Sequence, residues 1–173
     1  MNRTPILYNA KRFRCLDSGF LKLTEEATFH NSQNKRGVTW AVLEDVSASE
    51  AQGVKIAVFN THWSFAEYKG NSLAHIREAQ TKEMQELINR FSDQGIPVVA
   101  GGDFNAVYSD SIYTDLLEGC GMQDADMTAN GRITRNIVDH IAAAGVTLAS
   151  YVIYPAANAS DHDPVYCDVI LQK

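Results

Sequence analysis

Six polar residues with chemical potential lie at or near the ends of segments that read as strands. They are His62, Asp103, Asn105, Asp139, Asp161 and His162. Open sheets present ligand-binding side chains at strand ends. Two imidazoles, three carboxylates and one carboxamide suit the hydrolysis of a phosphoester. Carboxylate and amide oxygens bind a hard cation such as Mg²⁺ or Mn²⁺, and histidine transfers protons near neutral pH.

The segment 97–105 carries the strongest of these signals. An apolar strand runs into two glycines, and Asp103 and Asn105 follow. Two residues apart in an extended segment, their side chains leave the same face, where they can bind a cation or orient a phosphate. The alternative is a turn cap, because Asp and Asn both favour turns. The double glycine permits close backbone approach and favours the functional interpretation.

The remaining candidates are weaker when each is taken alone. His62 closes an apolar strand and could be structural. Asp139 lies inside an apolar stretch, where a carboxylate is costly unless a histidine or a metal pairs with it. Asp161 and His162 are neighbours, and neighbours in an extended chain point to opposite faces. Asp163 precedes a proline and could serve only to shape the turn.

The strands that must position these residues are rich in Val, Ile, Tyr and Phe and are bounded by Gly, Asn, Asp or Pro. We expect strands at residues 5–8, 13–23, 37–46, 54–62, 97–104, 137–142, 148–154 and 165–171. The segments 39–43 and 55–59 look like the two arms of a hairpin, with residues 47–53 as its loop.

An apolar stripe at helical spacing over residues 73–91 predicts one long helix. Asn71 or Ser72 can cap its start, and Gly95 follows its end. A shorter helix is expected over residues 111–118. Strands, a helix, a strand, a short helix and further strands make a mixed α/β domain in which sheets predominate.

Composition describes one globular domain over residues 1–173. The net charge is −6 and 45% of the residues are apolar, which is enough for a core without disulfide or metal staples. The acidic balance argues against a broad basic face that binds nucleic acid by charge alone. No apolar run is long enough to span a membrane, and no signal peptide is visible, so the cytoplasm is the default location. The thiols of Cys15, Cys120 and Cys167 are expected to be reduced.

Four motifs, taken together, point to a known family. They are Asn60-Thr61-His62, Gly102-Asp103-Phe104-Asn105, Val138-Asp139-His140-Ile141 and Ser160-Asp161-His162. In this order they resemble the endonuclease/exonuclease/phosphatase superfamily, and the resemblance covers nearly the whole chain. It implies the DNase I-like fold, a two-sheet β-sandwich flanked by helices.

The resemblance also implies catalytic roles. His162 would be the general base, or would contact the phosphate, and Asp139 would orient it. Asp103 would activate or position the attacking water, and Asn105 would hold the water or the phosphate. His62 would stabilise the transition state or assist the leaving group. Mechanisms described for the family differ on whether Asp103 or His162 takes the proton.

The implied metal is Mg²⁺ or Mn²⁺, held by Asp161 together with Asp103 and Asn105. Full members of the family begin with a strand that carries an Asn and continue to a strand that ends in a metal-binding Glu. Glu25 and Glu26 come too late in this sequence to be that residue. The N-terminal portion of the fold is therefore expected to be absent, either because the chain is a fragment of a longer gene product or because it is a naturally short version. In both cases we expect weaker metal binding, and if the chain is complete we expect a homo-oligomer that covers the missing region.

The function expected from this resemblance is metal-dependent hydrolysis of a phosphoester, as in a phosphodiesterase or nuclease, by in-line attack of an activated water. The alternative is a catalytically weak scaffold that serves as a binding module. The substrate is open, with nucleic acid among the candidates. Trp63 and Phe65 could stack on a base or a sugar, or could simply pack. A serine hydrolase built on Ser160 is disfavoured, because three consecutive residues do not form a triad.

Overall fold

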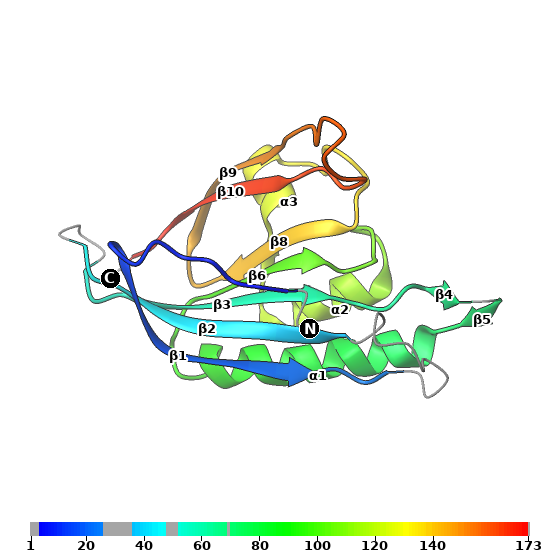
Figure 1. Cartoon of the computed structure of the whole chain (residues 1–173), viewed down its shortest axis with the longest axis horizontal. Helices are drawn as coiled ribbons and strands as arrows, with labels where there is room; N and C mark the ends of the chain where they lie inside the picture. The colour runs from blue at the N-terminus through cyan, green and yellow to red at the C-terminus, as the bar shows by residue number, and fades with distance from the viewer. Residues whose placement is uncertain (1–3, 26–35, 48–51, 69, 173) are drawn as a thin grey trace.

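The computed structural model describes residues 4–25, 36–47, 52–68 and 70–172 (Figure 1). Its centre is a six-stranded sheet in the order β1-β2-β3-β6-β8-β7. These strands are β1 (Phe13–Lys22), β2 (Gly37–Asp45), β3 (Lys55–His62), β6 (Val98–Asp103), β7 (Gln123–Asp124) and β8 (Asp139–Ala144). The β3–β6 pair is parallel and the others are antiparallel. A parallel pair needs a long crossover, and the helix between β3 and β6 supplies it.

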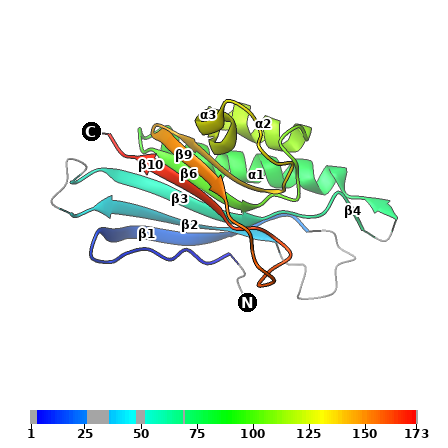
Figure 2. The same cartoon turned by 90° about the horizontal axis from the view of Figure 1, so that it is seen from above.

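The other elements surround this sheet. They are β4 (Glu67–Tyr68), β5 (Asn71–Ser72), α1 (Ala74–Ser92), α2 (Ser111–Cys120), α3 (Ala125–Asn130), β9 (Thr147–Ile153) and β10 (Val165–Ile170). The strands β9 and β10 pair to form a second, two-stranded sheet. The short β4–β5 pair extends beyond the end of the large sheet at which β3 and β6 finish, and Figure 2 gives the view from above.

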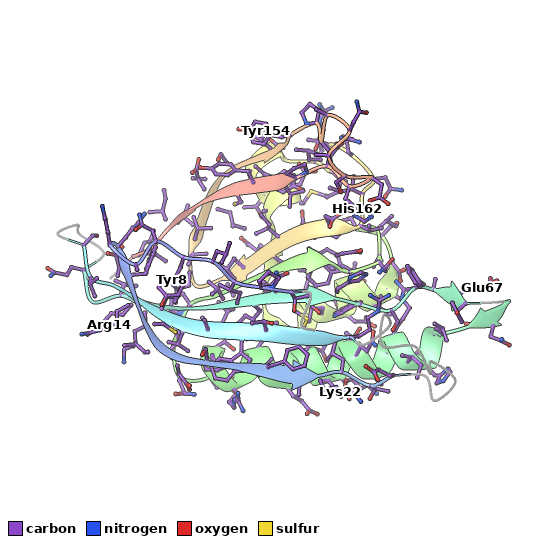
Figure 3. All side chains as sticks on the ribbon, in the orientation of Figure 1. Tyr8, Arg14, Lys22, Glu67, Tyr154 and His162 are labelled. Carbon is purple, nitrogen blue, oxygen red and sulfur yellow. The ribbon has the colours of Figure 1, made fainter. Side chains whose placement is uncertain are left out.

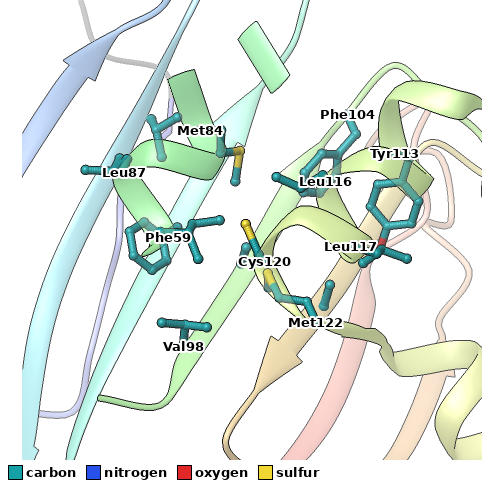
Figure 4. Packing of buried hydrophobic residues seen from close by; sticks show 14 of the residues in the cluster. Phe59, Met84, Leu87, Val98, Phe104, Tyr113, Leu116, Leu117, Cys120 and Met122 are labelled. Atoms are coloured by element: carbon teal, nitrogen blue, oxygen red, sulfur yellow. The ribbon is translucent and has the colours of Figure 1, made fainter. Parts of the chain in front are cut away.

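The two faces of the large sheet are covered by different elements, because side chains alternate along each strand. On the face that we call the helix face, Phe59 and Val98 pack with Met84 and Leu87 of α1 and with α2 (Figure 4). On the other face, which we call the second-sheet face, β9, β10 and α3 pack over Val99 and its neighbours on β8. The mixed α/β architecture with two packed sheets agrees with the expected fold class.

Seven of the eight predicted strands are present, and the hairpin of residues 39–43 and 55–59 is confirmed in β2 and β3. Part of its predicted loop, residues 48–51, lies outside the described residues. The prediction of a strand at residues 5–8 is wrong. This segment lies on the second-sheet face, where the carbonyl of Pro5 accepts a hydrogen bond from Asn60 Nδ2 at 2.9 Å and Ile6 packs on apolar side chains. Proline lacks an N–H, and these side-chain contacts replace a ladder.

The helix ends differ from expectation in detail. Leu73 occupies the N-cap position of α1, and the hydroxyl of Ser72 accepts a hydrogen bond from the Ala74 N–H at 3.3 Å. Gly95 adopts a left-handed conformation (φ 73°) just beyond the helix, as a helix-ending glycine does. The second helix runs to Cys120, past the expected end, because the left-handed residue that closes it is Gly121. The short elements α3, β4, β5 and β7 were not predicted.

Three further expectations concern the chain as a whole. The cysteines are free thiols, as expected. Among the residues that the structure describes, no helix has both the length and the apolar character needed to cross a membrane. The homo-oligomer stays a prediction, because the structure contains one chain.

Candidate active site

Three of the predicted residues lie side by side at one end of the large sheet. The strands β3, β6 and β8 are neighbours, and their register aligns His62 with Asp103 and Asp103 with Asp139. All three side chains leave the second-sheet face, because each is an even number of residues from an apolar residue of that face. Neighbouring strand ends thus bring together residues that are far apart in the sequence.

The fourth residue, His162, reaches this row from the loop between β9 and β10. Its Nδ1 atom lies 2.6 Å from Oδ2 of Asp139. The hydroxyl of Ser160 accepts a hydrogen bond from the His162 N–H at 3.0 Å and so shapes the loop. The side chain of His162 is 40% exposed, and Figure 3 shows it beside the beginning of β8. The imidazole is therefore fixed on one side and open on the other.

Burial and hydrogen bonding shift the pKa values of this pair. Burial raises the pKa of Asp139 above its usual range, although the hydrogen bond from His162 opposes this. The same hydrogen bond, to the Asp139 carboxylate, raises the pKa of His162, against a smaller opposing effect of burial. The pair therefore retains a proton between its two members to a higher pH than either group would alone. With the Nδ1 proton directed at Asp139, Nε2 is the ring atom left for a substrate.

A second imidazole–carboxylate pair lies next to the first. His62 Nε2 is 3.2 Å from Oδ2 of Asp103. The other carboxylate oxygen of Asp103 accepts a hydrogen bond from the Asn105 N–H at 2.8 Å. Both oxygens of Asp103 therefore have partners, one of which shapes the turn that follows β6.

Asn105 joins that turn to the chain beyond β3. Its Nδ2 atom donates to the carbonyl of Trp63 at 2.8 Å, and its backbone is in the left-handed region, with φ at 47°. Asn is among the few residues that adopt this conformation readily. Gly102 is required for a different reason. A Cβ atom there would lie 2.1 Å from the carbonyl oxygen of Thr61, so β3 and β6 approach too closely for any side chain.

The comparisons with known proteins concern the fold. The chain matches no protein-family model and no curated protein. Solved structures do resemble it. A mannosyl-6-phosphatase of Bacteroides thetaiotaomicron superposes with a TM-score of 0.74 at 17% identity, covering 95% of this chain and 69% of that one. The catalytic domain of human Nocturnin, solved with a bound sulfate, gives 0.73 at 19% identity, covering 94% and 62%.

A third structure decides the fold. An endonuclease/exonuclease/phosphatase from Bacteroides vulgatus superposes with a TM-score of 0.72 at 23% identity, covering 95% of this chain and 69% of that one. The chain has the fold of the endonuclease/exonuclease/phosphatase superfamily. It spans about two thirds of the length of these structures.

The metal expected for this superfamily finds little support in the side chains. In the described part of the chain, no three His, Cys, Asp or Glu residues are placed to hold an ion. Asp161 is exposed, and both oxygens of Asp103 are already engaged. These residues do not form a metal centre by themselves. The assignment of Asp161, Asp103 and Asn105 as ligands of Mg²⁺ or Mn²⁺ stays a prediction.

Two supporting residues near the site were not predicted from the sequence. Asp163 does more than shape a turn: its Oδ1 accepts a hydrogen bond from the Ala156 N–H at 2.8 Å, and Oδ2 pairs with Arg135. This fixes the loop that carries His162. His140 points to the helix face, opposite to Asp139, and its Nε2 lies 2.9 Å from the carbonyl of Ala106. In the sequence, the only indication of a role for Asp163 or His140 is that each directly follows a candidate residue, His162 or Asp139.

The two aromatic residues after His62 have different environments. Trp63 is fully buried and packs edge-on against Phe104, so its role is packing rather than stacking on a ligand. Phe65 is 44% exposed, with the guanidinium of Arg36 at 5.1 Å from the centre of its ring.

Proposed function

We propose that this chain is a phosphoester hydrolase that acts through His62, Asp103, Asn105, Asp139 and His162. The observation that carries the proposal is the alignment of two imidazole–carboxylate pairs on one face of the sheet, at the ends of neighbouring strands. Hydrolysis of a phosphoester by water needs a base for the nucleophile and positive charge beside the phosphoryl oxygens. Two imidazoles in one row suit both tasks.

We assign the base to His162. Asp139 accepts the Nδ1 proton, so that Nε2 of the neutral ring can take a proton from the attacking water. Asp103 is a poorer base, because one of its oxygens is bound by the Asn105 N–H and the other faces His62. Once protonated, His162 is an imidazolium that loses its proton to solvent after the reaction. In-line attack places the leaving oxygen on the opposite side of phosphorus from the water, so we assign its protonation to a protonated His62 instead.

The other two residues act on the phosphate. His62, when protonated, places a positive charge beside Asp103 and next to the phosphoryl group. Asn105 uses one amide hydrogen on the Trp63 carbonyl, which leaves the second for a phosphoryl oxygen. Its position is supported by the left-handed turn that contains it.

We extend the proposal to phosphodiesters and to dependence on Mg²⁺ or Mn²⁺, with nucleic acid as one substrate to be tested. A net charge of −6 disfavours tight, sequence-independent binding to DNA, because such binding uses many lysines and arginines. A small diester or a single-stranded oligonucleotide is therefore a better first substrate than duplex DNA.

The test is hydrolysis of bis(p-nitrophenyl) phosphate and of p-nitrophenyl phosphate, each with Mg²⁺, Mn²⁺ or EDTA. We expect the diester to be cleaved in a metal-dependent way, and His162→Ala and Asp103→Ala to lower the rate about 10²–10⁴-fold. His75→Ala and Asp115→Ala are matched controls on exposed helix positions and should stay within about twofold of wild type.

Two outcomes would contradict the proposal. One is a folded wild-type chain that cleaves neither ester under any condition, which would favour the binding-module alternative. The other is activity that both site variants retain, which would place the chemistry elsewhere in the molecule.

A further inference from the structure

Helix α1 buries two kinds of side chain on its inner face. Toward its C-terminal end this face is apolar, as in Met84 and Leu87, and packs on the sheet. In its first two turns the buried residues include Arg77, with a side chain 6% exposed, and Gln80, at 0%. Buried polar groups are costly unless hydrogen-bonded. The hydrogen-bond partners of these two side chains therefore show which segments the beginning of α1 fixes in place.

Arg77 holds the turn that follows β6. Its Nη2 atom donates to the backbone carbonyl of Asn105 at 2.7 Å and to Oδ2 of Asp110 at 3.0 Å. Asp110 is in turn the N-cap residue of α2. The guanidinium of Arg77 therefore binds both the left-handed turn residue, Asn105, and the N-cap residue of α2. Asp103 lies two residues before Asn105 in the same turn.

Gln80 holds the turn that follows β3. Its Oε1 accepts a hydrogen bond from the Ser64 N–H at 3.0 Å, and its Nε2 donates to Ser64 Oγ at 2.9 Å and to the carbonyl of Thr24 at 2.7 Å. Ser64 lies two residues after His62. Both ends of the carboxamide are used, and they clamp the backbone just beyond that histidine.

The two turns are also joined to each other between these anchors. The Trp63 N–H donates to the carbonyl of Asp103 at 2.9 Å, and Asn105 Nδ2 donates to the carbonyl of Trp63. Arg77 and Gln80 are three residues apart on one helix, so their separation is fixed by the helix itself. One rigid element therefore supports both sides of the gap between His62 and Asp103.

We propose that Arg77 and Gln80 are positioning residues that set the distance between His62 and Asp103 by clamping the turns after β3 and β6. The inference rests on the proposed function for its catalytic consequence, but the clamping can be measured without substrate. Misplacing a reacting group by about 1 Å can cost about 10²-fold in rate, so small movements of either turn matter.

The first experiment measures amide hydrogen exchange in the unliganded protein. Arg77→Lys keeps the charge but loses the forked geometry of arginine, and Gln80→Leu keeps the approximate volume without the hydrogen bonds. We expect exchange at least tenfold faster at Asn105 in the first variant and at Ser64 in the second. Gln85→Ala is the matched control, because Gln85 is a half-buried residue of the same helix whose Nε2 makes a solvent-exposed hydrogen bond to the carbonyl of Asp115. Unchanged exchange at both turns would overturn the proposal.

The second experiment separates positioning from general stability. We expect Gln80→Leu to lower kcat for the diester about 10–100-fold while KM changes less than about twofold. In a His62→Ala background the same change should cost no further activity, because its effect passes through that histidine. Gln80→Glu keeps an acceptor for the Ser64 N–H but places a buried carboxylate oxygen against the Thr24 carbonyl, so it should not recover the loss. An equal loss in both backgrounds would refute the positioning role.

Failure of this inference and failure of the proposed function give different results. A wild-type chain that hydrolyses nothing, with faster exchange at Asn105 and Ser64 in the variants, would refute the hydrolase and support the clamp. An active wild-type chain, with exchange and kcat unchanged in both variants, would support the hydrolase and refute the clamp.

Discussion

The substitution Asp139→Asn tests the proposed chemistry most directly. Asp139 holds the imidazole of His162 through a 2.6 Å bond to Nδ1. Asparagine has nearly the same shape but no charge, and its amide can present an N–H to the ring. The ring would then carry its proton on Nε2, the atom that must take a proton from water. We therefore expect the variant to fold normally and to lose activity.

The size of the loss follows from the hydrogen bond that is weakened. A hydrogen bond to a charged group contributes about 1.5–3 kcal/mol. Because the side chain of His162 is 40% exposed, solvent screens the interaction and the lower end of this range applies. About 1.4 kcal/mol corresponds to a tenfold change in rate. We expect kcat/KM for the diester to fall at least tenfold, and further where the wrong tautomer predominates.

The pH dependence gives an independent measure of the same interaction. A general base works in its neutral form, so activity should rise with pH through the pKa of His162. The Asp139 carboxylate raises that pKa, and its replacement should move the rise to lower pH, toward the ordinary histidine value of about 6.5. Asp168→Asn, on β10 at an exposed position, is the matched control. A variant with unchanged kcat/KM and an unchanged pH profile would refute the assignment of His162 and Asp139.

Two further predictions concern stability. Gly102→Ala should lower the free energy of unfolding in urea by about 3 kcal/mol or more, because the new Cβ would clash with the Thr61 backbone. Gly101→Ala is the control, because a Cβ at that position would make an ordinary contact at 3.5 Å. An equal loss of stability at both positions would contradict the reasoning. Burial raises the pKa of Asp124, but hydrogen bonds from His140, the Met127 N–H and Tyr113 outweigh it, so that the pKa is lowered overall. The stability that comes from this lowered pKa is present above the unfolded-state pKa of about 3.9 and is lost as the pH falls through the folded-state pKa. The free energy of unfolding of wild type should therefore fall more than that of Asp124→Asn between about pH 5 and pH 3. Parallel plots of unfolding free energy against pH for the two proteins would contradict this.

The sequence predicts individual strands better than it predicts their neighbours. Alternation and bounding turns identify β3 and β6 because both patterns are local. Nothing local says that these strands pair in parallel, or that β8 lies on the other side of β6. Their positions at strand ends suggested that His62, Asp103 and Asp139 belong to one site, and the resemblance to a known family added their roles. The contacts of Asp163 could not be predicted from local patterns, because its bonds to Ala156 and Arg135 form only where two loops meet in the folded chain.

One of the buried polar residues of α1, Gln80, can be recognised in the sequence because it interrupts the apolar stripe of the helix. The apolar stripe of that helix passes from Ile76 to Met84 and misses a position, and Gln80 occupies the gap. A polar residue on an apolar stripe usually marks a position near the edge of the buried face, yet Gln80 is fully buried. It is buried because the helix begins where the strands end, so its first turns face loop backbone with N–H and carbonyl groups to satisfy. We therefore expect a general pattern. Where a helix follows a strand that ends in a candidate catalytic residue, a polar residue near the beginning of the helix's apolar stripe predicts a side chain that binds the turn after that strand.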